Sequence, residues 1–306
     1  MAIAEKIVIE KKKKKSRKLS EILTPYFFLS PWVIGLLIFS VWPIVLSLYL
    51  SFTHYDLLQA PKWIGLQNYK NIFTNDQLFY TSLEVTFSYI LMSVPIRLIA
   101  ALAVALLLNQ KIKGIGIYRA IYYIPSLIGS SVAVAYLWQQ IFGPSGLFQT
   151  VLGYIGIHTS PWIDTPGTAL FTLSLLSAWA FGSSMLIFLA GLKGIPDTLY
   201  EAAEIDGAGK WKRFIHVTIP MLSPVVFFNL IMSIITGFTQ FTQGYIITDG
   251  GPINATLFYA LYLYNQFTYF RMGYASALAW ILLVMCVILS AIQFVLSKKW
   301  VTYDTV

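Results

Sequence analysis

Six stretches of the chain are apolar over at least the ~20 residues that an α-helix needs to cross a lipid bilayer. Because the bilayer interior offers backbone groups no hydrogen-bonding partner, stretches of this length must form helices. Over the whole chain 57% of the residues are hydrophobic and 11% are charged, far fewer charges than soluble domains carry. The sequence therefore predicts an all-α integral membrane protein with six transmembrane helices, near residues 26–52, 81–108, 119–143, 168–192, 219–247 and 274–297.

Basic residues are concentrated in one set of the segments that connect these stretches. Of the 21 Lys and Arg residues, 17 fall in the N-terminal tail, the second and fourth connections and the C-terminal end; 3 fall in the other connections and Arg97 lies within a stretch. Cytoplasmic segments of membrane proteins are enriched in Lys and Arg, so this asymmetry predicts that both termini are cytoplasmic. We expect residues 1–20 to form a basic tail that meets anionic lipid rather than nucleic acid, and residues 21–306 to form one transmembrane domain.

A short acidic segment, residues 200–208, lies in the predicted cytoplasmic connection 193–218. Thr198 and Glu201 have capping-box spacing, which predicts that a helix starts at Thr198, and Gly207 suits the position just after its end. A helix on a membrane surface usually carries Lys and Arg on its polar face, whereas this one is acidic and rich in alanine. We therefore favour a docking helix for a partner protein over a surface helix.

The same segment carries a family resemblance. Glu201-Ala202-Ala203, Gly207 and the closing Ile219-Pro220 resemble the EAA motif of the permease subunits of binding-protein-dependent ABC importers. The resemblance extends over about residues 25–300 and implies the type I ABC importer permease fold. Three further segments are similar to stretches of the carbohydrate-type, maltose-permease-like branch: Gly65–Tyr69, Thr248–Pro252 and Gly273–Ala277.

In that family the EAA loop is the coupling helix, which sits in a cleft of the cytoplasmic ATPase. The resemblance implies the same role here, with Glu201 as the charge partner and Gly207 as the turn. The ATPase-coupling residues that it implies are Glu201, Ala202, Ala203, Asp206, Gly207 and Pro220.

The resemblance also implies partners: a second, homologous permease subunit, two ATP-binding subunits and an extracytoplasmic solute-binding protein, in the cytoplasmic membrane of a bacterium. The chain has no G-x-x-x-x-G-K-[ST] loop, so we expect ATP and Mg to be bound by the partner ATPase and no cofactor by this chain. The three histidines have no spacing typical of a metal or catalytic site. The function implied is that of a permease subunit in an ATP-driven importer for a sugar or oligosaccharide.

The fifth apolar stretch carries a polar stripe, because Ser233, Gly237 and Gln240 recur at helical spacing. Such a stripe either contacts a polar substrate or packs neighbouring helices together, and these residues fit both. The resemblance favours substrate contact, since contacts in maltose-permease-like proteins align with these positions and near Ala180 and Ser183, although Ala180 offers no polar group. The predicted substrate path comprises Trp179, Ser183, Ser233, Gly237, Gln240 and Gln243.

Arg97 is the one basic residue deep within an apolar stretch. Intramembrane charge is a functional candidate, but we favour a pair with a neighbouring subunit or a side chain that reaches the interface past Pro95. A secondary transporter usually has several intramembrane ionisable groups and a membrane enzyme needs a catalytic cluster; the chain has essentially Arg97 for the first and no cluster for the second. Within the ABC class the alternative is an importer for glycerol phosphate or another polar solute.

Overall fold

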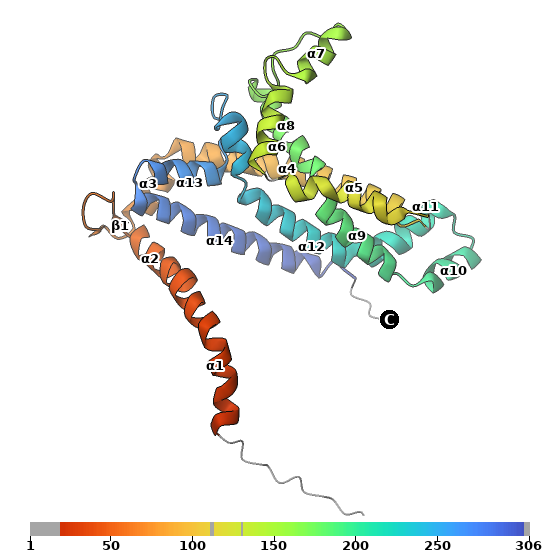
Figure 1. The fold of residues 1–306 in the computed structure, drawn as a ribbon, viewed down its shortest axis with the longest axis horizontal. Coiled ribbons are helices and arrows are strands. Elements are labelled where there is room, and N and C mark those ends of the chain that lie inside the picture. Colours follow the sequence, from red (N-terminus) through yellow and green to blue (C-terminus); the bar gives the residue numbers. More distant parts are fainter. Residues whose placement is uncertain (1–18, 111–112, 130, 303–306) are drawn as a thin grey trace, which may run out of the picture. The chain divides into compact units, whose positions relative to one another are not determined.

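A computed structural model of the chain describes residues 19–110, 113–129 and 131–302. The predicted basic tail, residues 1–20, lies almost wholly outside the described residues. The described chain is helical apart from one short strand pair and the connections (Figure 1). It divides into two compact units, residues 1–49 and 50–306.

The first unit is built from one apolar helix. α1 (Leu19–Leu36) continues through a π-helical turn, η1 (Leu37–Val41), into α2 (Trp42–Ser51). Pro43 follows this turn, and since proline has no amide hydrogen and its ring crowds the preceding turn, a wider turn ahead of it lets the helix continue. The segment Tyr26–Ser51 is long and apolar enough to cross a bilayer, close to the first predicted span.

The second unit contains the remaining elements. β1 (Thr53–His54) pairs antiparallel with β2 (Lys62–Trp63) in a small hairpin. The helices that follow are α3 (Gln67–Asn75), α4 (Gln77–Leu108), α5 (Ile115–Ile128), α6 (Val132–Phe142), α7 (Leu147–Tyr154), α8 (Pro166–Trp179), α9 (Gly182–Gly194), α10 (Asp197–Ile205), α11 (Lys210–Arg213), η2 (Phe214–Thr218), α12 (Ile219–Phe238), η3 (Gly244–Thr248), α13 (Tyr259–Thr268) and α14 (Met272–Ser297).

Among the described residues, four unbroken helices are long and apolar enough to span a membrane, and two bent pairs bring the number to as many as six. The third predicted span corresponds to α5 with α6 and α7, whose directions differ by 92°, and the fourth to α8 with α9, bent by 46°. The fifth begins with α11 and its helix ends at Phe238, ahead of the predicted limit at residue 247. The apolar stretches of the sequence thus correspond to helices, but three of these helices are interrupted at points that hydropathy does not indicate.

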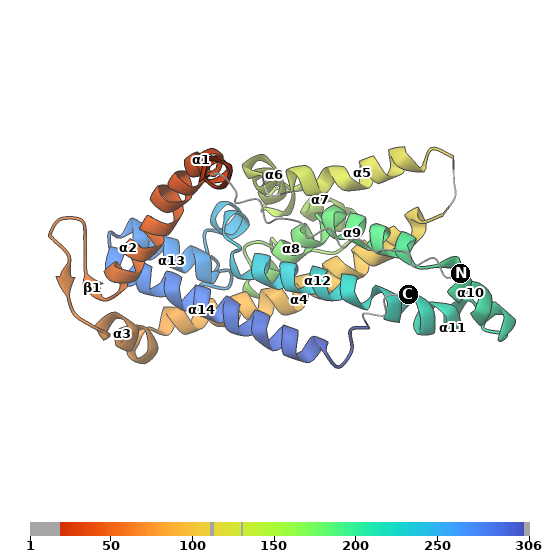
Figure 2. The same cartoon turned by 90° about the horizontal axis from the view of Figure 1, so that it is seen from below.

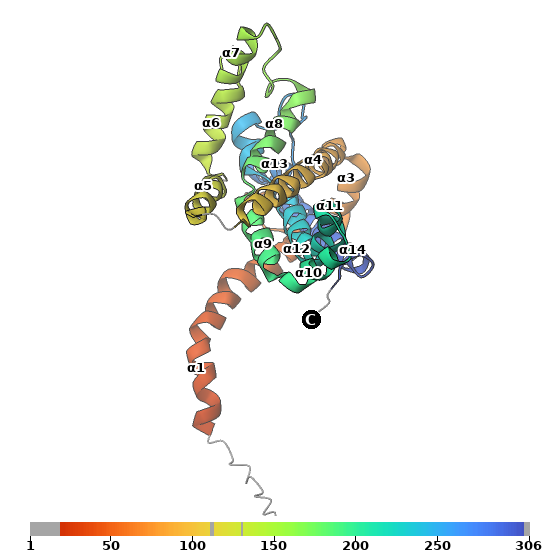
Figure 3. The ribbon, with the colours of Figure 1, turned by 90° about the vertical axis from the view of Figure 1, so that its right-hand side faces the viewer.

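α4 is the helix around which the second unit is assembled. It packs against α8, α9 and α12 and also contacts α13 and α5. α4, α12 and α14 lie along roughly the same axis (Figure 2), while α6 and α7 project away from them (Figures 1 and 3). α10 and α11 lie at one end of this unit and α3 at the other (Figures 1 and 2).

The two halves of α4 belong to different parts of the core. Its first half joins a cluster with buried side chains of α8, α13 and α14, which includes Tyr89, Leu173 and Phe258. Its second half contributes Ala101 and Ala105, both fully buried, to a cluster with α9 and α12. Small side chains four residues apart let a neighbouring helix approach closely, which is how helices gain contact in lipid without a hydrophobic driving force.

The start of α4 is fixed by Asp76. One carboxylate oxygen, Oδ1, accepts a hydrogen bond from the amide of Phe79 at 3.0 Å and so caps the helix. The other, Oδ2, accepts the hydroxyls of Tyr262 in α13 and Tyr274 in α14. Burial, together with the hydrogen bond to Asp76, raises the pKa of the Tyr262 hydroxyl, which therefore stays protonated and donates. One carboxylate thus joins three helices.

The segment that resembles G-L-x-N-Y is a structural element. The buried amide of Asn68 donates to the backbone carbonyls of Ser51 and Thr53, both at 2.9 Å, and the hydroxyl of Tyr69 donates to Ser51 Oγ at 2.8 Å. These bonds satisfy carbonyl groups where the chain leaves α2 and enters the hairpin. The residues of this segment therefore hold α3 against residues 51–53, within the second unit.

Replacing Asp76 with alanine removes the cap and leaves two tyrosine hydroxyls without their acceptor. We expect a loss of about 2 kcal/mol of stability, or roughly 4 °C or more in Tm. Thermal unfolding of the detergent-solubilised chain measures it. Asp56→Ala is the matched control, because Asp56 only accepts the amides of Leu58 and Gln59 in an exposed turn. Equal Tm values for the two variants would contradict the role of Asp76.

Candidate functional site

A polar cavity lies where α4 and α12 meet the breaks of the bent helices. It has a volume of about 210 Å³ and is called here the central cavity. Five of the six residues predicted for the substrate path line it: Ser183, Ser233, Gly237, Gln240 and Gln243. The sixth, Trp179, does not; its ring packs against Trp138 with a centroid distance of 6.3 Å. Ala180, which has no polar side chain, does line the cavity.

The end of α12 supplies one wall. The helix stops at Phe238, and the next residues turn, with the Gln240 amide bonded to the carbonyl of Gly237 at 3.3 Å. Gln240 Nε2 donates to Gln243 Oε1 at 2.7 Å, so the two side chains hold each other at the cavity. A Cβ atom on Gly237 would lie 2.5 Å from Ile90 Cγ1, which shows how closely α12 approaches α4.

The break between α8 and α9 supplies a second wall and is bridged from α5. Ser126 Oγ donates to the carbonyl of Ala180 at 3.0 Å and accepts the amide of Ser183 at 3.2 Å. These are the backbone groups that the break leaves without helical partners. A Cβ on Gly182 would lie 2.9 Å from the carbonyl oxygen of Tyr122, so α5 rests directly on the start of α9. Interrupted helices in a membrane need such replacement partners.

α4 supplies the third wall, with Tyr89, Ser93 and Arg97 on one face at intervals of four residues. Arg97 Nε is buried and has no hydrogen-bond partner among the described residues. From the sequence, Arg97 was expected to contact a neighbouring subunit or to reach the membrane surface. The structure instead brings Arg97 to the cavity wall. The i, i+4, i+8 spacing of the three polar residues was a signal that sequence analysis missed. Ser126 and Ser177 also line the cavity, and no local pattern identifies them.

The predicted coupling loop forms α10. This helix begins at Asp197 with Pro196 at its N-cap, and no side chain caps it, so the predicted start at Thr198 with a capping box is wrong. A proline at this position fixes the backbone without needing the capping bond. The C-terminal prediction is confirmed: Gly207 has a φ of 75°, and the amide of Ala208 bonds to the carbonyl of Ala203 at 2.9 Å in a Schellman motif.

α10 and α11 present an accessible surface. Every residue predicted for coupling in α10 and its turn is exposed or half-buried, and Ile205 is 87% exposed while Trp211 is 71% exposed. Arg213 Nη1 pairs with Glu204 Oε2 at 2.7 Å, so Glu204 already has a partner within the chain, whereas no described residue forms an ion pair with Glu201. The large apolar side chains at Ile205 and Trp211 were not predicted as site residues. The predicted Pro220 lies at the start of α12, directly after η2.

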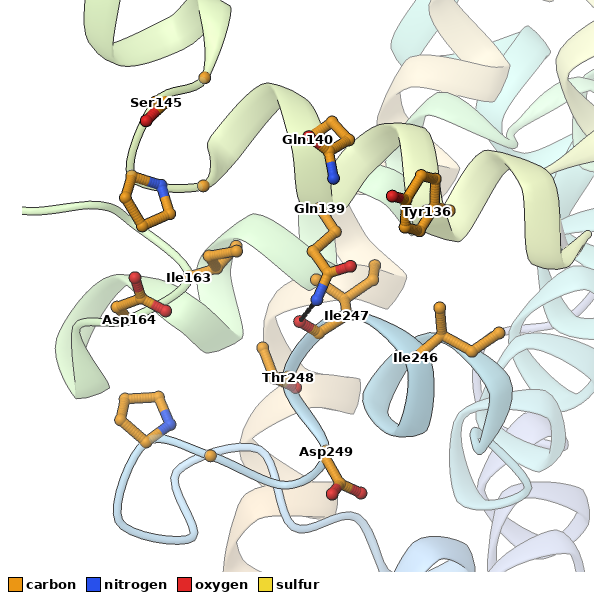
Figure 4. A pocket seen from close by; sticks show the side chains of 15 residues that line it. Tyr136, Gln139, Gln140, Ser145, Ile163, Asp164, Ile246, Ile247, Thr248 and Asp249 are labelled. Carbon is orange, nitrogen blue, oxygen red and sulfur yellow. Dashed lines mark hydrogen bonds between the residues drawn. The ribbon is translucent and has the colours of Figure 1, made fainter.

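A second and larger space, about 770 Å³, lies between the end of α6 and the turn after η3 (Figure 4). Gln139 Nε2 donates across it to the carbonyl of Ile247 at 3.2 Å. Asp164 and Asp249 contribute carboxylates to its lining, and the segment that resembles T-x-G-G-P forms one side. We call it the loop cavity.

A family model described as "Binding-protein-dependent transport system inner membrane component" matches residues 81–302. The matched region contains the central cavity, α10 and α12. The chain belongs to this family. The permease is therefore a transport component rather than an enzyme, and the alternatives of a secondary transporter and a membrane enzyme are set aside.

Curated relatives align with nearly the whole permease. It is 51% identical to the probable ABC transporter permease protein YesP of Bacillus subtilis (strain 168), over 95% of this chain and 96% of the relative. It is 34% identical to the arabinooligosaccharides transport system permease protein AraP of the same organism, over 92% of this chain and 90% of the relative. It is also 34% identical to the trehalose/maltose transport system permease protein MalF of Thermococcus litoralis, over 86% and 89%.

Solved structures share the fold. A chain of a bacterial alginate ABC transporter, crystallised in complex with an alginate pentasaccharide-bound periplasmic protein, superposes with a TM-score of 0.78 at 20% identity, covering 92% of the permease and 97% of that chain. A chain of a bacterial ABC transporter involved in the import of the acidic polysaccharide alginate gives 0.73 at 21% identity, covering 90% and 95%. The predicted type I importer permease fold is confirmed.

The close contact of α5 with Gly182 yields a matched pair of glycine variants. Gly182→Ala places a Cβ 2.7 Å from Ser126 Oγ and against the backbone of α5, so we expect it to lower Tm and raise amide exchange at residues 180–183. Gly116→Ala in α5 has no atom within 4 Å of the new Cβ and gains up to about 1 kcal/mol of helix propensity. Differential scanning fluorimetry and hydrogen exchange compare them. A neutral or stabilising effect of Gly182→Ala would refute the contact.

Proposed function

We propose that the permease forms half of the translocation path of an ATP-driven importer for a sugar or oligosaccharide. The observation that carries this proposal is the central cavity, where hydroxyl and amide side chains converge inside a set of apolar helices. Sugars are recognised by such neutral hydrogen-bonding groups, which a membrane protein can hold at a smaller cost than charges. The names of the relatives AraP and MalF, which concern arabinooligosaccharides and trehalose/maltose, point the same way.

The size of the cavity supports a shared path. About 210 Å³ is below the roughly 300–1,000 Å³ of typical ligand pockets. A second, homologous permease facing this one would complete the path, and the predicted residues Ser183, Ser233, Gly237, Gln240 and Gln243 would contribute one side of it. Trp179 is outside this lining and packs against Trp138.

The proposed coupling surface is α10 with its turn. Glu201 is exposed and would pair with a basic residue of an ATPase, while Ala202 and Ala203 allow a close approach. Ile205 and Trp211 would provide apolar contacts, since large exposed apolar side chains mark protein interfaces. Asp206 and Gly207 form the turn that ends the helix.

Movement of α10 would reach the substrate path through α12. The hydroxyl of Tyr200 in α10 hydrogen-bonds with Thr218 Oγ1 at 3.0 Å, at the junction that leads into Pro220 and α12. α12 in turn carries Ser233 and Gly237 on the cavity wall. We propose that closure of the ATPases on ATP shifts α10 and turns α12, which opens the path outward, and that hydrolysis returns it inward.

The remaining parts of the system are also proposed. The uneven distribution of Lys and Arg supports cytoplasmic termini and a cytoplasmic α10, in the cytoplasmic membrane of a bacterium. The family description supports a solute-binding protein outside the membrane. Two ATP-binding subunits would hold ATP and Mg, and the permease itself would bind lipid, no cofactor and no nucleic acid.

ATP-driven uptake by the assembled complex tests the function. The permease, its second permease, the ATPase and the binding protein are reconstituted in proteoliposomes with labelled di- to pentasaccharides outside and ATP inside. We expect accumulation of saccharide that depends on both ATP and the binding protein. Accumulation without ATP, or of no saccharide at all, would refute the proposal.

Glu201→Ala tests the coupling surface. Losing a charge-assisted contact with the ATPase costs about 1.5–3 kcal/mol, so we expect uptake to fall roughly tenfold or more and to separate from ATP hydrolysis, with insertion unchanged. Gly207→Val should act similarly, because a β-branched residue is strained at a φ of 75°. Glu84→Ala, at an exposed glutamate of α4 far along the chain, is the matched control. Normal uptake and hydrolysis by the Glu201 variant would contradict the assignment.

A further inference from the structure

Arg97 lies where two cavities meet. A third space, of about 250 Å³ and distinct from the loop cavity, adjoins the central cavity. Four residues line both: Arg97, Ser183, Ser233 and Thr236. Arg97 is therefore at the boundary that the two spaces share. The other three shared residues are hydroxyl-bearing and carry no charge.

The charge of Arg97 is not balanced within the described part of the chain. Neither cavity has an aspartate or glutamate in its lining. The one ion pair among the described residues joins Arg213 to Glu204, and neither residue lines these cavities. Arg97 Nε is buried and makes no hydrogen bond to any described residue. Arg97 as a whole is half-buried, and intramembrane arginines are normally paired because an unpaired charge away from water is unfavourable. No described residue of this chain supplies the anion that such a position favours.

We propose that Arg97 binds a carboxylate of the transported molecule, so that the cargo is an acidic saccharide, an oligosaccharide that contains uronic acid. The inference rests on the proposed function and specifies its substrate class. A guanidinium group presents a planar fork of donors that matches the two oxygens of a carboxylate. Hydroxyl and amide groups of Ser93, Ser183 and Gln240 on the same lining are suited to the neutral hydroxyls of the sugar ring.

The number of positive charges favours a carboxylate over a phosphate. A phosphate monoester carries about −1.5 to −2 charges at neutral pH, whereas a carboxylate carries a single charge. Arg97 is the one basic residue in the lining of the two cavities. The loop cavity cannot supply an alternative anion site, because its lining includes Asp164 and Asp249 and no basic residue.

The test uses pairs of substrates that differ only in charge. Oligouronates of two or three residues, from the galacturonate, glucuronate and mannuronate series, are each compared with the neutral oligosaccharide obtained by carboxyl reduction. ATP-driven uptake is measured for the complete complex in proteoliposomes, with wild-type permease, Arg97→Gln and Arg97→Lys. Arg271→Gln is the matched control, because Arg271 lines neither cavity.

We expect the wild-type complex to import at least one oligouronate. Arg97→Gln should lower that uptake about tenfold or more, since it removes a charge-assisted bond, and should leave any uptake of the neutral counterpart within about twofold. Oligouronate uptake by Arg97→Lys should lie between that of the wild type and that of Arg97→Gln, because lysine keeps the charge but loses the planar fork. Arg271→Gln should match wild type with both substrates.

Four outcomes would overturn the inference. Equal losses for acidic and neutral substrates in Arg97→Gln, with a lower yield of assembled complex, would mean that Arg97 instead pairs with the second permease. Unchanged oligouronate uptake in Arg97→Gln would remove the arginine from the path. A wild-type complex that imports only neutral saccharides would refute the acidic cargo and leave the proposed function intact, whereas uptake of no saccharide would overturn both.

Discussion

The fold depends on the absence of water in the bilayer interior, where every backbone N–H and C=O group must find a partner within the protein. An unbroken helix meets this requirement by itself, as in α4 and α14. The interruptions after α5, α8 and α12 do not, and all three face the same cavity. There Ser126 satisfies the backbone of one break, while Gln240 and Gln243 pair beside another. The broken helices and the polar side chains therefore occur at the same place, because the polar side chains supply hydrogen bonds to backbone groups that the breaks leave free.

α4 positions these breaks relative to one another, because it packs against most of the other helices of the second unit. Its length lets one helix contribute to both core clusters, with aromatic residues in the first and Ala101 and Ala105 in the second. Asp76 fixes one end by joining α4 to α13 and α14. The face that carries Tyr89, Ser93 and Arg97 is thereby held against the breaks of three other segments. The position of the arginine follows from the packing of this one helix.

The sequence predicted what depends on composition and on local backbone chemistry. Apolar length predicted where the long apolar helices lie, and the need for a positive φ identified Gly207. The same approach failed where two local signals competed: Thr198 had capping-box spacing, yet Pro196 sets the start of α10. It also failed where tertiary contacts decide. Ser126 acts on a break 54 residues further along the chain, which no sequence pattern reveals.

The continuous helical segment from Lys210 to Phe238 has a mechanical consequence. Its 29 residues correspond to about 43 Å at 1.5 Å per residue, with the exposed surface of α10 and α11 near one end and the central cavity near the other. Under the proposed coupling, a small tilt of a rigid rod of this length about its Lys210 end would displace its Phe238 end by several ångströms. Ser233 and Gly237 lie near that end of the helix and line the central cavity. A change in the angle of this one helix would therefore change the shape of the central cavity as well.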